Sequence, residues 1–390
     1  MNLYFDNAST SFPKPNEVVE SVTNFMLNIG ASSSRGFYKN SIESNRILFD
    51  CRERLCLLFH YNKPQNIIFS YNATYSFNLL LNSLINSEIF ISKPHVLVSK
   101  LDHNSTLRPL INLSNKGIIQ LEFLNCTTNN FIDLEDLKSK IKYNTKLVIL
   151  SHMSNVLGNI QDIKSISEIC KKYNIYFILD CAQSCGIVDI NLNKIYFSSI
   201  IFTGHKNLFS THGIGGFIIS DDLLDKCENY FLGGTGSDSS NLISKDNMPD
   251  YFEIGTHNMI GICSLLSGIN FIESFGLNNI FNHKKQLLKN FYDELKNISD
   301  IILLNDVIME HQNSTLCLNF KNIPPDEASF ILNKYFNICV RVGLHCAPET
   351  HKLMNTYPLG CIRISPSIFN TNNDMEFLVS SINKISKNSY

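Results

Sequence analysis

One lysine of this chain stands where an amine could do covalent chemistry. Lys206 ends the sequence Thr-Gly-His-Lys, which follows a short apolar run at 200–202 and precedes a glycine-rich stretch, 213–216, that we expect to be a loop. An amine on such a turn, flanked by the hydrogen-bonding side chains of Thr203 and His205, suits a lysine that forms a Schiff base with an aldehyde cofactor. A lone lysine is usually a surface residue, so this interpretation depends on the other polar residues of the chain.

Other polar residues follow predicted strands in the same way. Predicted strands, separated by helical patterns, occur at 67–70, 96–99, 119–123, 147–150 and 175–179, and most of their residues are apolar. Such strands, alternating with helices, are typical of a mostly parallel sheet covered on both faces. Ligands bind these sheets beyond the carboxyl ends of the strands. We therefore expect a ligand site formed by polar residues at or just past these ends, namely Thr74, His103, Asn155, Asp180 and Lys206.

Each of these residues also has a purely structural interpretation. Asn72 or Thr74 can simply cap the helix that follows, although a helix N-terminus also favours a bound anion. A lone histidine such as His103 is more often structural than functional. The repeated position at strand ends is what favours a ligand site.

The last part of the chain contributes a thiol and a cation. Cys346 lies in the loop sequence Gly-Leu-His-Cys-Ala-Pro, a setting that permits exposure and a lowered thiol pKa, whereas a cysteine is by default an inert apolar filler. Arg363 lies inside the apolar strand predicted at 361–365 and needs an anionic partner. That partner is either a substrate carboxylate or a structural Asp or Glu.

Bulk properties restrict the class of protein. The chain has 390 residues, 44% of them hydrophobic, so we expect one large and one smaller lobe. A net charge of −2 with mixed signs gives no indication of a nucleic-acid partner. The twelve cysteines include no Cys-x-x-Cys pair, and Cys181 and Cys185 are four apart, so we expect no metal site. We also expect no signal peptide and no membrane helix, and hence a cytoplasmic protein with reduced thiols.

Taken in order, the motifs carry a family resemblance. They read Asp-Asn-Ala-Ser-Thr, Asn-Ala-Thr, Asp-His-Asn, Ser-His-x-Ser-Asn-Val-x-Gly, Asp-x-Ala-Gln, Thr-Gly-His-Lys, Glu-x-Gly-Thr-x-Asn, Arg-x-Gly-x-His-Cys-Ala and Arg-Ile-Ser. From residue 4 to about residue 370 the chain resembles the cysteine desulfurases of the class-V aminotransferase family, which are pyridoxal-phosphate (PLP) enzymes of fold type I.

The resemblance implies an α/β fold with two domains. The large PLP-binding domain, 15–270, would contain a mostly parallel seven-stranded sheet between helices. Residues 1–14 and 271–390 would form a smaller α+β domain that carries the catalytic cysteine loop.

The resemblance also implies roles for individual residues. Lys206 would hold PLP and move protons, His103 would stack on the ring and act in acid–base chemistry, and Cys346 would be the nucleophile that becomes a persulfide. Asp180 would pair with the pyridine nitrogen and Gln183 with the phenolic oxygen. The remaining cofactor-binding residues would be Ala73, Thr74, Asn155, Thr203 and His205, together with Gly255 and Thr256 reaching the phosphate of a partner subunit. Substrate-binding residues would be Asn7, Ala8, Asn155, Arg341 and Arg363.

The implied reaction converts L-cysteine to L-alanine in a homodimer and passes the sulfur to an acceptor protein. Alternatives are selenocysteine lyase, which would take L-selenocysteine, an epimerase or transaminase, or a non-catalytic sulfur-carrier or regulatory module. The chain departs from the family pattern at Ser9, where Ala is usual, at Tyr75, where many relatives are acidic, and at Leu344, where a second His is found.

Overall fold

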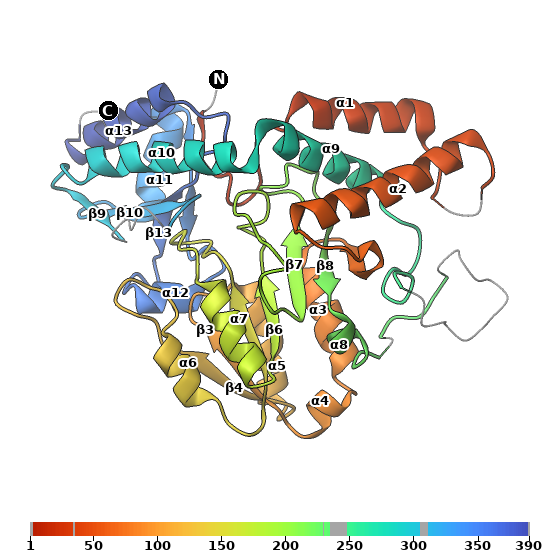
Figure 1. The fold of residues 1–390 in the computed structure, drawn as a ribbon. Coiled ribbons are helices and arrows are strands. Elements are labelled where there is room, and N and C mark those ends of the chain that lie inside the picture. Colours follow the sequence, from red (N-terminus) through yellow and green to blue (C-terminus); the bar gives the residue numbers. More distant parts are fainter. Residues whose placement is uncertain (1–2, 34–35, 229, 235–247, 305–310, 389–390) are drawn as a thin grey trace.

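The computed structural model describes residues 3–33, 36–228, 230–234, 248–304 and 311–388. In this part of the chain a central seven-stranded sheet lies between two layers of helices, and a smaller sheet with its own helices lies beside it (Figure 1). Within the described ranges no single helix is both long and apolar enough to cross a membrane, although one bent pair of helices, 259–275 with 277–295, passes the test when counted together.

The large sheet has the order β2-β8-β7-β6-β5-β3-β4. Its strands are β2 (Ile67–Ser70), β3 (His95–Ser99), β4 (Gln120–Leu124), β5 (Thr145–Ser151), β6 (Tyr176–Asp180), β7 (Ser199–Thr203) and β8 (Gly215–Ile219). All pairs are parallel except those that β8 makes with β2 and β7. The expected mostly parallel, seven-stranded α/β sheet is therefore confirmed.

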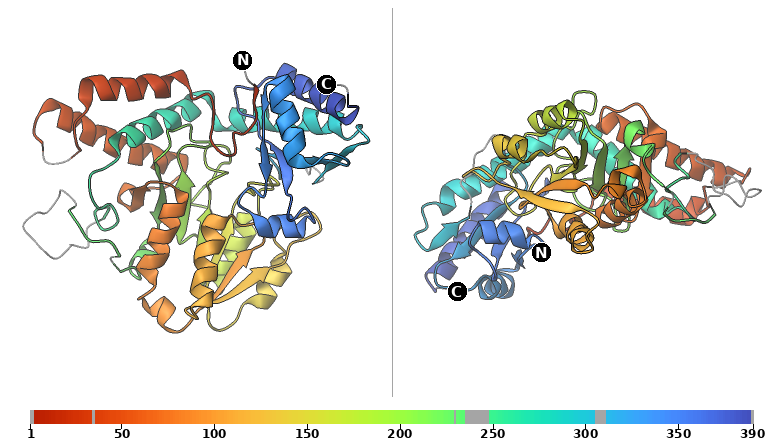
Figure 2. Two further views of the ribbon diagram at one scale, coloured as in Figure 1. Left: turned by 180° about the vertical axis from the view of Figure 1, so that it is seen from behind. Right: turned by 90° about the horizontal axis from the view of Figure 1, so that it is seen from below.

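Alternate residues of the buried strands face opposite helical layers, as period-two side-chain geometry requires. Ile67 and Phe69 pack into one core and Ile68 into the other. The first core lies under α2 (Lys39–Leu58), α6 (Leu134–Lys140), α7 (Ile163–Lys172) and α9 (Met259–Phe275). The second lies under α3 (Ala73–Leu84), α4 (Glu88–Ile91) and α5 (Asn104–Asn115), which are in front in the view from behind (Figure 2).

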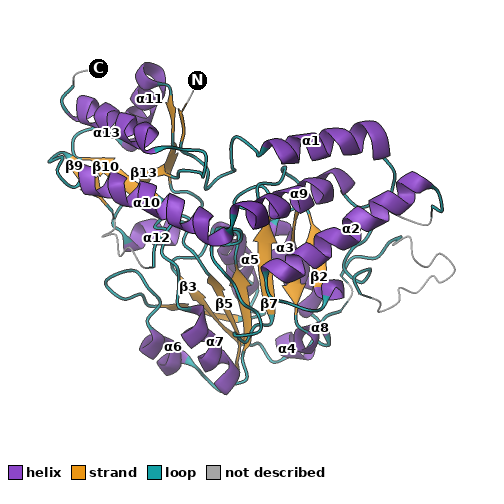
Figure 3. Cartoon of the chain, turned by 45° about the horizontal axis from the view of Figure 1, so that its top comes forward, coloured by secondary structure: helices purple, strands orange, loops and turns teal. Residues whose placement is uncertain are grey.

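A four-stranded antiparallel sheet forms the core of the smaller lobe. Its order is β12 (Arg341–Gly343), β13 (Cys361–Ile364), β10 (Leu316–Phe320) and β9 (Ile301–Leu303). The helices around it are α10 (Leu277–Leu295), α11 (Pro325–Phe336) and α13 (Asn372–Ser386). Figure 3 shows this lobe beside the large sheet and α9 running on toward α10.

The first residues of the chain join this second lobe. The strand β1 (Leu3–Tyr4) pairs with β11 (Ile338–Cys339), and Phe5 is buried among α10, α11 and α13. Residues 3–5 therefore pack with the smaller lobe, as they must if residues 1–14 and 271–390 form one domain. The exact domain boundaries stay a prediction. The helix α1 (Asn16–Asn24) then returns the chain to the large lobe, where it packs on α9.

Two sequence expectations were wrong in detail. The glycine-rich stretch after Lys206 is partly a strand, because Gly215 and Gly216 begin β8 inside the sheet. A Cβ at Gly216 would lie 2.2 Å from the carbonyl oxygen of Ile68, so the close approach of β8 to β2 requires glycine. The sequence also predicts one strand near 339–342, from its apolar residues, whereas the structure has two short strands there, β11 and β12, which join different sheets.

Candidate active site

A cavity of about 690 Å³ opens at the carboxyl ends of the parallel strands. It lies where β2, β5, β6 and β7 end and where the smaller lobe contributes β12 and β13. The residues predicted from the sequence that line it are Ala8, Ala73, Thr74, His103, Asn155, Asp180, Gln183, Thr203, His205, Lys206, Arg341 and Arg363. Tertiary structure thus brings together the residues that the strand-end argument and the resemblance had grouped.

Lys206 lies three residues past the end of β7, in the turn that follows this strand. Burial lowers the pKa of its ammonium to about 8, while the nearby Asp180 carboxylate opposes that shift and the two arginines, Arg363 and Arg341, add to it. A lysine with such a pKa is partly neutral near physiological pH, so it can act as a nucleophile toward an aldehyde.

One end of the cavity presents hydrogen-bond donors and acceptors that have no protein partner. The helix α3 begins there, and the Asn72 side chain caps it by accepting from the Tyr75 N–H at 2.9 Å. Thr74, in the first turn of α3, is exposed at the cavity. Thr203 Oγ1 and His205 Nδ1 are buried and find no hydrogen-bond partner among the described residues. Unpaired buried groups beside a helix N-terminus fit an anion such as a phosphate.

The middle of the cavity contains a buried carboxylate and a neutral imidazole. Asp180 ends β6, accepts a hydrogen bond from the Ala182 N–H at 2.9 Å, and has a pKa raised by burial. His103 caps α5, with its Nδ1 accepting from the Ser105 N–H at 3.0 Å. Burial, with the cations Lys206 and Arg341 nearby, lowers the pKa of His103 to about 3. The imidazole is therefore neutral, and its proton is on Nε2.

Gln183 completes the middle of the cavity. Its Nε2 donates to the carbonyl oxygen of Ala8 at 2.9 Å, whereas its Oε1 is buried and has no partner among the described residues. Ala8 therefore contributes a backbone oxygen that fixes Gln183, in addition to a small side chain in the cavity wall.

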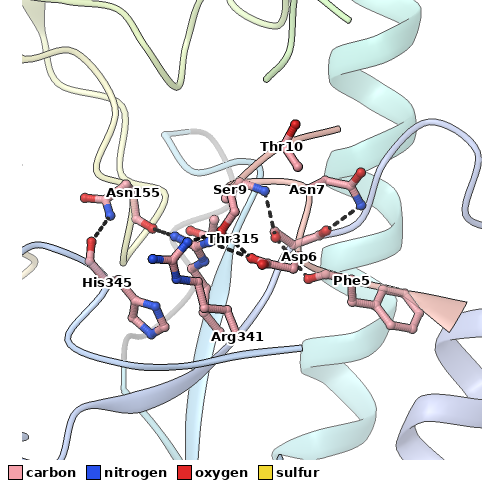
Figure 4. A network of polar contacts seen from close by, with 12 residues as sticks. Phe5, Asp6, Asn7, Ser9, Thr10, Asn155, Thr315, Arg341 and His345 are labelled. Atoms are coloured by element: carbon pink, nitrogen blue, oxygen red, sulfur yellow. Dashed lines mark hydrogen bonds and ion pairs between the residues drawn. The ribbon is translucent and has the colours of Figure 1, made fainter. Parts of the chain in front are cut away.

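Two arginines define the end of the cavity toward the smaller lobe. Arg341 on β12 lies directly opposite Arg363 on β13. Arg363 donates from Nη2 to Asp6 Oδ1 and to Ser9 Oγ, both at 2.8 Å, and Arg341 donates from Nη1 to the same Ser9 Oγ at 2.5 Å (Figure 4). Asp6 is the structural carboxylate that the sequence allowed as a partner of Arg363. Arg363 Nε is buried with no partner in the described ranges, so this end still has capacity for an anion.

Asn155 connects the arginines to the cysteine loop. Its backbone oxygen accepts from Arg363 Nη1 at 3.0 Å, and its side chain donates from Nδ2 to the carbonyl oxygen of His345 at 2.7 Å (Figure 4). The amide of Asn155 therefore positions the loop next to Cys346 in this structure.

Cys346 is exposed at the edge of the cavity. Its carbonyl oxygen accepts from the Asn104 N–H at 2.8 Å, at the start of the helix that His103 caps. A thiolate at Cys346 would raise the pKa of Lys206. His345 and Cys346 both have left-handed backbone conformations, with φ of 48° and 57°. Because of these two conformations, the imidazole of His345 is buried while the thiol of Cys346 faces solvent.

Besides Cys346, three predicted residues lie outside the cavity wall. Asn7 is buried against the backbone, donating to the Ser365 carbonyl at 3.0 Å and accepting from the Phe12 N–H at 3.0 Å, so its amide is occupied. Gly255 and Thr256 are exposed and line a neighbouring pocket of about 250 Å³, which shares Tyr75 with the main cavity. Their expected contact with a partner subunit stays a prediction.

Sequence reasoning missed several residues of the site. Ser9 was noted only as a departure from the family pattern, yet it contacts both arginines and donates to Asp6 Oδ1 at 2.6 Å. The other missed lining residues are Asn72, Tyr75, Asn78, Ser105, Ser151, Met153, Ala182 and His345. Half of these eight adjoin a predicted site residue in the sequence, which was the available signal; they are Asn72, Tyr75, Ala182 and His345.

Residues 3–378 match the model of the family described as aminotransferase class-V, and the chain belongs to this family. It is 29% identical over 391 residues to a "probable cysteine desulfurase" of Borreliella burgdorferi, covering 99% of this chain and 92% of that protein. It is 27% identical to one of Methanothermobacter thermautotrophicus, with 98% and 94% covered. An apo structure of a cysteine desulfurase from Thermococcus onnurineus superposes with a TM-score of 0.93 at 28% identity, covering 99% of this chain and 95% of that chain.

An Escherichia coli cysteine desulfurase, at 20% identity and a TM-score of 0.87, supports the fold alone. The family implies dependence on PLP, and the residues present fit that group. The unpaired Thr203 Oγ1 and His205 Nδ1 suit its phosphate, Asp180 suits its pyridinium nitrogen, and Lys206 supplies the amine for its aldehyde. The chain is thus a PLP-type enzyme related to cysteine desulfurases.

Proposed function

We propose that this protein is a cysteine desulfurase, which converts L-cysteine to L-alanine and takes up the sulfur on Cys346 as a persulfide. The observation that carries the proposal is an exposed thiol at the edge of the cavity that contains Lys206. An aldehyde-binding lysine alone is common to many reactions, whereas a nucleophilic thiol beside it indicates sulfur transfer.

Thr74, Thr203, His205, Asp180 and Lys206 would hold PLP. When bound, this cofactor supplies an electron sink for the bond changes at the substrate carbons. The buried carboxylate of Asp180 would keep a proton on the pyridine nitrogen, because removing a cation from a carboxylate inside the protein is costly.

The two arginines would bind the substrate carboxylate. A guanidinium recognises a carboxylate through paired, charge-assisted hydrogen bonds. Arg363 is fixed by Asp6 and by the Asn155 carbonyl, so it is held in position before substrate arrives. Arg341 is less buried and has only Ser9 as a hydrogen-bond partner in the described ranges, which leaves its donors available to substrate.

Lys206 and His103 would move protons. The Lys206 amine, with its lowered pKa, can remove the proton from the substrate Cα and return a proton to the carbon skeleton. The neutral His103 carries a proton on Nε2, since its Nδ1 is occupied by the Ser105 N–H. Its Nε2–H can therefore donate a hydrogen bond to the substrate while the ring stays neutral, and His103 passes this proton on only as Nδ1 takes up another.

Cys346 would then take the sulfur as a thiolate. An S–S bond forms between Cys346 Sγ and the substrate sulfur as the substrate Cβ–S bond breaks, and the electron pair stays with the carbon skeleton. Two protons, one of them from the substrate thiol, then complete L-alanine. No external oxidant is needed, because the two electrons that the two sulfur atoms lose on forming the S–S bond are the pair that the substrate carbon gains. Exposure of Cys346 suits onward transfer to an acceptor protein.

Steady-state chemistry tests the proposal. With PLP and L-cysteine plus a thiol reductant, the protein should form sulfide and alanine in equal amounts. Cys346→Ala should lose sulfide formation while it keeps the visible absorbance of lysine-bound PLP, and Lys206→Ala should lose that absorbance. Cys339→Ala, a cysteine of β11 outside the cavity, is the matched control and should retain activity.

Undiminished sulfide formation by Cys346→Ala would contradict the proposal. Turnover of L-selenocysteine without turnover of L-cysteine would replace it with a selenocysteine lyase. The homodimer, the cytoplasmic location and the acceptor protein stay predictions. Sedimentation of the holoenzyme tests the first of these, with a monomer as the contradicting result.

A further inference from the structure

Three potential metal ligands meet in the interior next to the cysteine loop. They are Cys317 on β10, Cys361 on β13 and His345, and the ligand atoms they offer all lie within 4.8 Å of one another. All three side chains are buried, with 0%, 0% and 4% of their surface exposed. No other group of three His, Cys, Asp or Glu side chains meets this closely in the part of the chain that is described.

Strand register brings the two thiols together. Cys317 lies opposite Arg363 in the antiparallel pair of β10 and β13, and Cys361 is two residues before Arg363. Both cysteines therefore lie on the same face of the small sheet as diagonal neighbours. The left-handed backbone at His345 and Cys346 then turns the imidazole inward onto this face. A left-handed conformation is strained for an L-residue such as His or Cys, so the inward position of this imidazole needs a reason.

The spacing of these groups suits a tetrahedral cation. Cys361 Sγ lies 3.5 Å from His345 Nε2. Metal–sulfur bonds of about 2.3 Å and metal–nitrogen bonds of about 2.0–2.1 Å at a tetrahedral angle separate the two ligand atoms by about 3.5 Å. In the present geometry His345 Nε2 also lies 3.1 Å from the Cys361 carbonyl oxygen, and Cys317 Sγ donates to the Val156 carbonyl at 3.1 Å. A cation would replace the protons of these two hydrogen bonds.

Charge and ligand type restrict which cation fits. The two thiols lie in an apolar cluster with Leu101, Val156, Leu157 and Ala347. Two thiolates and a neutral imidazole around a divalent ion have no net charge, which suits apolar surroundings. Thiolate and imidazole ligands favour Zn²⁺ over oxygen-binding cations such as Mg²⁺.

We propose that Cys317, Cys361 and His345 bind one Zn²⁺, with a fourth position open to a small ligand. Cysteine spacing along the chain predicts no metal site, whereas these three ligands come from three separate segments. Since His345 directly precedes Cys346, zinc at this site ties the thiol-bearing loop to the small sheet and fixes its conformation. The proposal rests on the geometry of the three ligands and is independent of the proposed desulfurase activity.

Metal retention by the full-length PLP-loaded protein tests the site. All variants are made in a protein that carries Cys346→Ser, called the background protein, so that no zinc bound by the exposed thiol is counted. After exposure to Zn²⁺ and gel filtration, elemental analysis should find about one zinc per chain, as one site requires. Cys317→Ser should weaken retention by at least about tenfold, a loss like that caused by disturbing a metal's ligand shell. Cys170→Ser, at an equally buried cysteine of the large-domain core, should retain the zinc.

Two further measurements separate a lost ligand from a damaged fold. Zn²⁺ should raise the unfolding temperature of the background and Cys170→Ser proteins but not of Cys317→Ser, with circular dichroism checking that each is folded. Co²⁺ in place of Zn²⁺ should give the visible bands of tetrahedral thiolate coordination, and Cys317→Ser should abolish them. The proposal is overturned if the background protein retains no zinc, or if Cys317→Ser retains as much as Cys170→Ser.

Discussion

Ser9 occupies the position between the two arginines that a substrate carboxylate would need. Its hydroxyl oxygen accepts from both Arg341 and Arg363 and donates to Asp6. A substrate carboxylate must therefore displace this hydroxyl or share the guanidinium donors with it.

Ser9→Ala should lower KM for L-cysteine by a few-fold and change kcat less, because the arginine donors are left unpaired until a carboxylate arrives. Removing the Ser9 hydroxyl, and with it these hydrogen bonds, should lower the free energy of unfolding by about 1 kcal/mol in the absence of substrate. Steady-state kinetics and denaturant unfolding measure the two effects. Ser381→Ala, whose hydroxyl bonds only its own helix at Phe377, is the control. A raised KM would show that Ser9 helps to bind substrate.

Lys206 gives a second prediction at this scale. Its pKa is lowered to about 8 by burial, so the amine is protonated below that pH and neutral above it. The rate at which the apoprotein captures PLP should therefore rise with pH, with a midpoint near 8. Stopped-flow absorbance across this range measures it. A rate that is flat with pH, or that falls as pH rises, would show that the amine is not the titrating nucleophile.

At the scale of elements, the segment before α1 supports the turn that carries Lys206. In the described structure the carbonyl oxygen of His205 is approached by Ser11 N–H at 3.0 Å, Thr10 Oγ1 at 3.0 Å, Ser11 Oγ at 3.3 Å and Lys14 Nζ at 3.0 Å. His205 directly precedes Lys206, so these donors orient the peptide that fixes the lysine. An N-terminal segment thereby becomes part of the cofactor turn.

Lys14→Met should loosen this turn while it keeps most of the side-chain volume. We expect PLP to dissociate a few-fold faster, because one charge-assisted hydrogen bond to the His205 carbonyl is lost. The loss of bound-cofactor absorbance after dilution into a PLP trap measures the rate. Lys172→Met, at the exposed end of α7, is the matched control. Equal dissociation rates in the two variants would exclude a supporting role for Lys14.

At the scale of the whole molecule, one buried lysine links the two lobes. Lys284 on α10 donates to Asn207 Oδ1 at 3.2 Å, one residue after Lys206, and to Ser314 Oγ at 3.0 Å, just before β10. Burial lowers the pKa of Lys284 to about 7, far below that of the unfolded chain. Between these two pKa values the unfolded state binds more protons than the folded state, so stability from this group rises with pH.

Lys284→Met should therefore flatten the dependence of stability on pH. From pH about 7 to about 9 the wild-type free energy of unfolding should gain on the order of 2 kcal/mol relative to the variant. Denaturant unfolding at several pH values measures the difference. Lys289→Met, exposed on the same helix, should leave the wild-type slope unchanged. A difference between wild type and Lys284→Met that is constant with pH would show that Lys284 does not titrate in this range.

The sequence alone determined the large sheet and the strand-end site, because these depend on local patterns. Continuous apolar runs identify buried parallel strands, and the carboxyl ends of such strands lie on one edge. Thr74, His103, Asp180 and Lys206 therefore came together as expected. The antiparallel strand β8 was missed, because its first two residues are glycines and read as a loop.

Only the tertiary structure decided the contacts between segments far apart in the chain. The Asp6 and Ser9 bonds to Arg363, the four donors on the His205 carbonyl and the cluster of Cys317, Cys361 and His345 each join distant residues. The amide of Asn7 donates to the Ser365 carbonyl just past β13 for the same reason, and its expected part in substrate binding stays a prediction. Such contacts depend on register and lobe packing, which leave no periodic pattern in the sequence.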